Sequence, residues 1–287
     1  MAKRPDKTAD NSSHSLSPFW LACRALGLVM LSYFGIVMVI KFFENRFVYL
    51  PTPWPQGSDI SLSDFTQDVT FNSDTGVPLH AWRLTCPNPR AHVLFLHGNA
   101  GNLAGRQSML EALHDAQEID LFAFDYRGYG KSQGRPSEAA NISDARTARR
   151  VYATMAGIPE SEIVLMGRSL GGGVAVGLAA EDGARGLILQ STFTSLPDMA
   201  ARQFPWLPVR LMMKNRYPSL ERLPEYHGPL LCSHSRDDTI IPFQMGRELF
   251  AAGNEPKAFY QITGCDHNDP QPDGYKPILS DFFDSLP

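Results

Sequence analysis

The most informative part of this sequence reads Ile163-Val-Leu-Met-Gly-Arg-Ser-Leu-Gly-Gly-Gly173. An apolar, β-branched run that fits a buried strand ends in Gly-x-Ser-x-Gly and continues into small residues with helical character. The chain must turn sharply at Ser169, and Gly167 and Gly171 avoid a collision with the neighbouring backbone. The pattern therefore predicts a nucleophilic serine raised on a turn between a strand and a helix.

The same glycines permit a second interpretation. Gly167, Gly171 and Gly173 spell Gly-x-x-x-Gly-x-Gly, which resembles the nucleotide-binding turn of short-chain dehydrogenases. Those enzymes also need a Tyr-x-x-x-Lys pair downstream, which this sequence lacks, and their turn follows the first strand instead of lying mid-chain. We therefore expect no nucleotide and no other cofactor.

The composition is that of an ordinary globular protein with 287 residues, 43% hydrophobic and 20% charged, and a net charge of −4. This charge, without a basic cluster, argues against a nucleic-acid partner. The four cysteines show neither metal-type pairing nor the spacing of a disulfide framework. Several acidic residues lie near His267, but none has the spacing of a helix-borne ligand pair, so we expect no catalytic metal.

The N-terminal fifth differs from the rest of the chain. Residues 1–18 are polar and are expected to form a disordered tail. Residues 19–43 would span about 37 Å as a helix, enough for a hydrocarbon core of about 30 Å. Arg24 and Lys41 could reach the two interfaces. We predict one transmembrane anchor in the lipid bilayer. A buried core helix is the alternative, and a cleaved signal peptide lacks a small-x-small site after the apolar run.

Charge around the anchor bears on its orientation. The N-terminal side carries Lys3, Arg4, Lys7 and Arg24, against Lys41 and Arg46 on the other side. This excess predicts a cytoplasmic N-terminus and an extracytoplasmic catalytic domain.

The remainder is expected to comprise a connector over residues 44–64 and one domain over residues 65–287. Two antiparallel strands come first, at 67–72 and 77–84. Six further strands are predicted at residues 92–97, 121–125, 162–167, 186–190, 229–234 and 258–262. Helices are predicted at residues 103–114, 137–155, 170–182, 244–252 and 277–283. This alternation indicates an α/β fold with a mostly parallel sheet covered by helices on both faces, whose ligands bind beyond the carboxyl ends of the strands.

The loops after these strands carry a set of motifs. They read His97-Gly-Asn99, Asp125-Tyr-Arg-Gly-Tyr-Gly130, Gly167-Arg-Ser-Leu-Gly171, Asp238 followed by Ile-Ile-Pro242, and Asp266-His-Asn-Asp269. In this order they resemble the α/β-hydrolase family, in particular its small membrane-tethered branch, which includes protein depalmitoylases and lipid hydrolases. The resemblance covers roughly Phe42 to the C-terminus and implies an α/β-hydrolase fold with a Ser-Asp-His triad.

Roles follow from the motifs and the resemblance. Ser169 is expected to be the nucleophile, His267 the general base and Asp238 the acid that orients it, with Asp237 as the near rival of Asp238. The backbone N–H groups of Asn99 and Leu170 are expected to form the oxyanion hole.

Residues 192–227 bear on the substrate, because this range holds many apolar side chains where a lid is usual. The range fits either simple helix packing or an acyl-chain groove and membrane-facing lid. Together with the anchor, it favours a hydrophobic carboxylic ester or thioester of lipid or acyl type. A serine peptidase is the enzymatic alternative, and a non-catalytic membrane-bound binding protein is the alternative from another class.

Overall fold

The computed structural model of the protein describes residues 18–55 and 60–287. The chain divides into two compact units, Met1–Phe43 and Glu44–Pro287. Of the polar tail expected over residues 1–18, all but Pro18 lie outside the described residues.

The described part of the first unit, residues 18–43, contains helix α1 (Pro18–Phe42), which has 25 residues and no buried side chain. Helix α1 is long enough to cross a membrane, and its mean hydropathy of 2.1 is high enough. A signal sequence near an N-terminus can have the same length and hydropathy. The role of α1 as an anchor stays a prediction.

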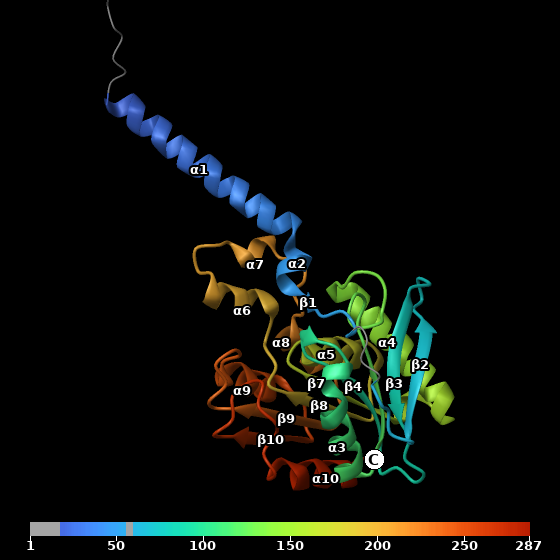
Figure 1. The fold of residues 1–287 in the computed structure, drawn as a ribbon. Coiled ribbons are helices and arrows are strands. Elements are labelled where there is room, and N and C mark those ends of the chain that lie inside the picture. Colours follow the sequence, from blue (N-terminus) through green and yellow to red (C-terminus); the bar gives the residue numbers. More distant parts are fainter. Residues whose placement is uncertain (1–17, 56–59) are drawn as a thin grey trace, which may run out of the picture. The chain divides into compact units, whose positions relative to one another are not determined.

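The second unit is built on one sheet of eight strands (Figure 1). The strands are β2 (Thr66–Asn72), β3 (Pro78–Leu84), β4 (His92–Leu96), β6 (Asp120–Phe124), β7 (Ile163–Arg168), β8 (Gly186–Gln190), β9 (Leu230–Ser235) and β10 (Lys257–Ile262). Their spatial order is β10-β9-β8-β7-β4-β6-β3-β2, and only the β2–β3 and β3–β6 pairs are antiparallel. The expected mostly parallel sheet is confirmed, and β7, which leads to Ser169, lies near its centre.

Helices cover both faces of the sheet, as predicted. On one face, α4 (Glu138–Ala156), α5 (Leu170–Asp182) and α9 (Phe243–Ala252) pack with Leu94 and Leu96 of β4. On the other face, α3 (Gln107–Gln117) and α10 (Tyr275–Asp284) pack with Val93 and Phe95 of the same strand. Side chains alternate between the faces because successive residues of a strand point in opposite directions. Short 3₁₀ turns lie at η1 (Ala104–Arg106), η2 (Glu160–Glu162) and η3 (Leu223–Glu225).

The segment between β8 and β9 forms three short helices, α6 (Leu196–Gln203), α7 (Val209–Met212) and α8 (Ser219–Arg222). Its apolar side chains divide into two groups. Leu207, Val209 and Met212 are buried, whereas Phe204, Trp206 and Leu211 are exposed, with Leu211 at 90%. Part of the segment therefore packs in the way expected of simple helices, and an acyl-chain groove and membrane-facing lid stay a prediction.

Part of the range expected as a connector, residues 44–64, belongs to the larger unit. It contains α2 (Glu44–Val48) and β1 (Leu50–Pro51), and β1 pairs in parallel with the two-residue strand β5 (Ala100–Gly101). The buried carboxylate of Glu44 accepts hydrogen bonds from two backbone N–H groups that follow α7, those of Lys214 and Asn215. We call residues 44–54 the strap, because they join the loop after β4 to the segment after α7.

Candidate active site

Ser169 lies between β7 and α5 with a backbone φ of 54°. A serine rarely adopts such a conformation, and strained backbone of this kind persists only where the surroundings hold it. The Ser169 N–H donates to Gln190 O at 2.9 Å, and the Thr192 hydroxyl donates to Ser169 O at 2.7 Å. A Cβ on Gly171 would come within 1.9 Å of the carbonyl oxygen of Leu96, so only glycine fits there. The turn therefore has the close backbone approach that the sequence predicts.

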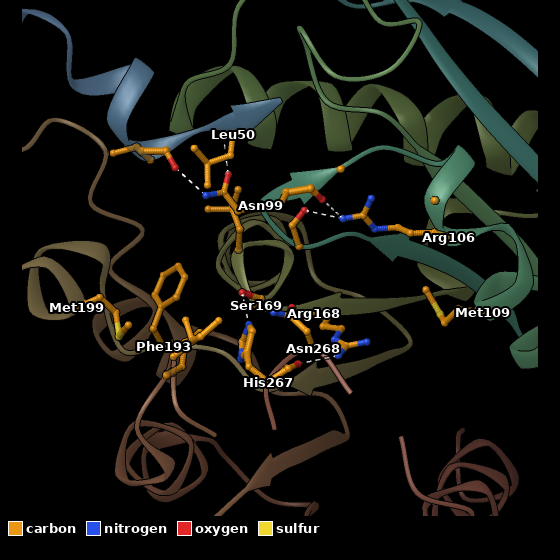
Figure 2. A pocket seen from close by; sticks show the side chains of 18 of the residues that line it. Leu50, Asn99, Arg106, Met109, Arg168, Ser169, Phe193, Met199, His267 and Asn268 are labelled. Carbon is orange, nitrogen blue, oxygen red and sulfur yellow. Dashed lines mark hydrogen bonds between the residues drawn. The ribbon is translucent and has the colours of Figure 1, made fainter. Parts of the chain in front are cut away.

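The three residues predicted to form a triad meet at this turn, and Figure 2 shows two of them, Ser169 and His267. His267, in the loop after β10, places its Nε2 atom 3.0 Å from Ser169 Oγ. Its Nδ1 atom lies 2.7 Å from Oδ2 of Asp238, which follows β9. The imidazole therefore lies in position to exchange a proton with the serine hydroxyl, and the carboxylate lies in position to fix its tautomer.

Asp238 occupies a site that keeps it ionised. Its Oδ1 atom accepts hydrogen bonds from the N–H groups of Ile240 and Ile241 at 2.9 and 2.7 Å. Burial alone would raise the pKa of Asp238, but hydrogen bonds from His234, His267 and the Ile241 N–H outweigh it and hold the pKa well below its usual value. A charged acceptor is therefore always available to His267 near neutral pH.

Asp237, the rival acid, has another place. It is exposed, and its Oδ2 atom accepts a hydrogen bond from the Gly264 N–H at 2.6 Å. Its carboxylate therefore ties together the loops after β9 and β10, while Asp238 contacts the histidine.

The loop after β4 is held from several directions. His97 is buried and contacts the carbonyl oxygen of Gly98 through Nδ1 at 2.7 Å. Burial lowers the pKa of His97 well below its usual value, so the ring is neutral and Nδ1 donates. The Asn99 side chain donates to Val48 O at 2.7 Å and accepts from the Tyr129 hydroxyl at 2.8 Å.

The strap forms hydrogen bonds with the loop after β4. The Leu50 N–H also donates to the Asn99 side-chain oxygen, at 3.3 Å, so that the amide group joins the strap to the loop. Leu170 begins α5, where a helical N–H has no acceptor in a preceding turn. The backbone amides of Asn99 and Leu170 stay the predicted oxyanion donors.

Comparisons with known proteins agree with this architecture. The sequence model of a family described as "alpha/beta hydrolase fold" matches residues 91–212. The chain is 32% identical to the alpha/beta hydrolase domain-containing protein WAV2 of Arabidopsis thaliana, over 82% of this chain and 84% of that protein. The chain belongs to the α/β-hydrolase family.

Two further similarities agree with this family and fold. This α/β hydrolase is 37% identical to an uncharacterized protein of Mycobacterium tuberculosis, over 87% of this chain and 90% of that protein. An esterase of Pyrococcus furiosus has the same fold, with a TM-score of 0.65 and 21% identity over 83% of this chain and 99% of the esterase. The predicted family and fold class are therefore confirmed, and the family indicates hydrolase activity.

A cavity of about 680 Å³ opens beside Ser169 and His267. We call the apolar lining that comes from the strap, the segment after β8 and the loop after β9 the apolar wall of this α/β-hydrolase pocket: Val48, Leu50, Phe193, Leu196, Met199 and Ile240. The lining also includes Arg106, Met109, Arg168 and Asn268. In Figure 2, Phe193 and Met199 lie on one side of the Ser169–His267 pair, and the two arginines lie on the other. Across residues 18–55 and 60–287, no cluster of His, Cys, Asp and Glu has the geometry of a metal site.

Sequence reasoning did not assign several of these residues. His234 contacts Asp238, with 3.3 Å between Nε2 and Oδ2, although its sequence position indicates only the end of a strand. Arg168 lies inside the Gly-x-Ser-x-Gly motif, and this adjacency to the nucleophile is the one signal that could have identified it. Arg106 and Val48 carry no such signal.

Proposed function

We propose that this α/β hydrolase is a membrane-anchored serine hydrolase that cleaves carboxylic esters or thioesters. The observation that carries the proposal is the hydrogen-bonded series from Ser169 through His267 to Asp238 at the mouth of a partly apolar cavity. A serine alcohol becomes a useful nucleophile at neutral pH only with such a base and orienting acid.

The reaction has two halves. Ser169 Oγ attacks the acyl carbonyl while His267 accepts its proton, and the N–H groups of Asn99 and Leu170 stabilise the developing oxyanion. His267 then protonates the leaving alcohol or thiol, and an acyl-enzyme remains on Ser169. Water, activated by the same histidine, hydrolyses the acyl-enzyme. Asp238 stays ionised throughout and stabilises the imidazolium.

The apolar wall supports a hydrophobic acyl group. Phe193, Leu196 and Met199 come from the segment after β8, and methionine adapts to flexible chains because its thioether side chain is unbranched. Helix α1, acting as an anchor, would hold the enzyme at a membrane, where acyl esters of lipids and lipid-modified proteins occur. We infer that the anchor spans the bilayer with the N-terminus in the cytoplasm and the catalytic unit outside it.

Turnover of matched substrates tests the proposal. Full-length protein in neutral detergent should cleave p-nitrophenyl acyl esters and the corresponding acyl thioesters faster than aminoacyl p-nitroanilides. Ser169→Ala should remove this activity and leave the thermal unfolding midpoint unchanged. Faster cleavage of the amides would favour a peptidase, and folded wild type without turnover of any of these substrates would favour a binding protein.

A further inference from the structure

The pocket beside Ser169 has an uneven distribution of charge. Among the described residues, its lining includes the guanidinium groups of Arg106 and Arg168 and no aspartate or glutamate. Elsewhere in the unit, Arg83, Arg127 and Arg149 each pair with a carboxylate at 2.6–3.0 Å. The pocket arginines therefore differ from other partly buried arginines of the same protein.

Arg168 directly precedes the nucleophile and uses only part of its hydrogen-bonding capacity. Its Nη2 atom donates to the backbone carbonyls of His267 at 2.7 Å and Asp269 at 3.1 Å. These contacts support the histidine loop, yet no carboxylate in the described chain pairs with the guanidinium. A guanidinium group has five N–H donors, so Arg168 retains donors that could bind a ligand.

Arg106 adds a second positive charge. Its guanidinium donates to the carbonyl oxygens of Asn102, Gly98 and Ala100, in the loop that contains Asn99. Carbonyl dipoles satisfy the donors but do not neutralise the charge. Burial lowers the pKa of Arg106 and of Arg168, and the charges of Asp125 near Arg106 and of Asp238 and Asp269 near Arg168 offset only part of this effect.

We propose that the preferred substrate is an acyl ester or thioester whose leaving group carries an anionic oxygen group, either a phosphate or a carboxylate. The acyl chain lies along the apolar wall, and the anion lies on the other side of Ser169, where it binds Arg168 within the positive field to which Arg106 contributes (Figure 2). Guanidinium is the side chain best matched to phosphate and carboxylate geometry. This inference rests on the proposed serine hydrolase.

The chemistry stays that of acyl transfer. Ser169 Oγ forms a bond to the acyl carbon, and the bond from that carbon to the leaving oxygen or sulfur breaks. The serine proton passes through His267 to the leaving atom, which departs as an alcohol or thiol that still carries its anion. Water then releases the carboxylic acid from Ser169, so no other co-reactant is required.

Matched substrates test the preference in the full-length protein. A monoacylglycerol phosphate and an acyl ester of glyceric acid are compared with the monoacylglycerol of the same acyl chain, short enough to remain monomeric. Because a hydrogen bond to a charged group stabilises the bound anion, we expect kcat/KM for at least one anionic ester to be roughly 10- to 100-fold higher than for the neutral monoacylglycerol. Which anionic ester is preferred identifies the anion. Glycerol phosphate or glycerate, but not glycerol, should competitively inhibit cleavage of the neutral ester.

Substitution of Arg168 tests the assignment of the anion site. Arg168→Gln should reduce the ratio of anionic to neutral kcat/KM to about one, whereas Arg168→Lys should retain part of it, because a single charge without the planar fork remains. Arg150→Gln is the matched control, since Arg150 is an exposed arginine that pairs with Asp74 on the surface. Inhibition by the free anion requires no substitution and therefore tests the site even if Arg168→Gln does not fold.

The outcomes separate the two proposals. Cleavage of the neutral ester without a preference for either anionic ester overturns the anion site and leaves the serine hydrolase intact. A preference that Arg168→Gln leaves unchanged also overturns it, as does faster cleavage of a half-ester whose anion lies on the acyl side. Failure to cleave any ester, together with an unreactive Ser169, overturns both proposals.

Discussion

Two adjacent carboxylates, those of Asp237 and Asp238, have different partners in this protein, and only one of them contacts His267. Asp237 and Asp238 are chemically identical neighbours, and the turn after β9 directs them to different partners. Oδ2 of Asp238 lies 2.7 Å from Nδ1 of His267, whereas Oδ2 of Asp237 accepts a hydrogen bond from the Gly264 N–H at 2.6 Å. The family pattern favours Asp238, but residue type alone could not separate the two, because the separation depends on backbone direction at one position.

This difference leads to a paired prediction. Asp238→Asn should lower kcat about 10³- to 10⁴-fold, because an amide can no longer fix the His267 tautomer or stabilise the imidazolium. Asp237→Asn should stay within about threefold of wild type, as expected for a surface substitution of small energetic effect. Steady-state ester hydrolysis measures both variants. An equal loss in the two variants would contradict the assignment of Asp238 as the orienting acid.

At the scale of secondary-structure elements, the turn from β7 to α5 depends on close backbone approach. A Cβ on Gly171 would meet the Leu96 carbonyl oxygen at 1.9 Å, and one on Gly167 would meet the Gly171 carbonyl oxygen at 2.4 Å. Neither contact involves a flexible side chain, so the start of α5 would have to move away from β4 and β7.

Gly171→Ala should therefore destabilise the protein by about 3 kcal/mol or more, at the upper end of overpacking substitutions. Gly105→Ala serves as the control, because a Cβ there meets nothing within 4 Å. Thermal unfolding of the purified variants measures the difference. If the thermal unfolding midpoint of Gly171→Ala equalled that of the control, the turn from β7 to α5 would not need this glycine.

The strap supplies the second prediction at this scale. Asn99→Ala removes the contacts of the side chain with Val48, Leu50 and Tyr129. If the strap positions the loop after β4, whose Asn99 N–H is a predicted oxyanion donor, kcat should fall roughly tenfold with little change in KM. This loss is smaller than the one expected when an oxyanion donor is removed completely. Tyr129→Phe removes one of the three contacts and should have a smaller effect. A change confined to KM would mean that Asn99 affects substrate binding alone.

The same elements show how far sequence patterns reach. Strands such as β7 and β8 are continuous apolar runs between turn residues, so their local pattern predicts them closely. The strap has no such pattern. Its strand β1 has only two residues, and Leu50 in it pairs with Ala100. Its Glu44 carboxylate accepts a hydrogen bond from the N–H of Asn215, which is distant in the sequence. Contacts of this kind depend on the assembled unit. The sequence therefore predicts a connector over residues 44–64, and it does not predict that Arg168 and Val48 line the pocket.

For the whole molecule, the topology of the chain in a membrane can be tested directly. The excess of Lys and Arg before α1 predicts that a reporter fused after Pro287 is active outside the cytoplasm. The full-length protein should also resist alkaline extraction from membranes, as expected for a spanning helix. Reporter activity in the cytoplasm would contradict the proposed orientation, and extraction by alkali would contradict the anchor.

Covalent labelling of the full-length protein with a fluorophosphonate probe, followed by mass spectrometry of its peptides, tests directly whether Ser169 is an activated nucleophile. We expect one adduct, on Ser169, that disappears in Ser169→Ala and forms much more slowly in Asp238→Asn. A folded wild-type protein that carries no adduct on Ser169, or that is labelled equally well on another serine, would contradict this expectation.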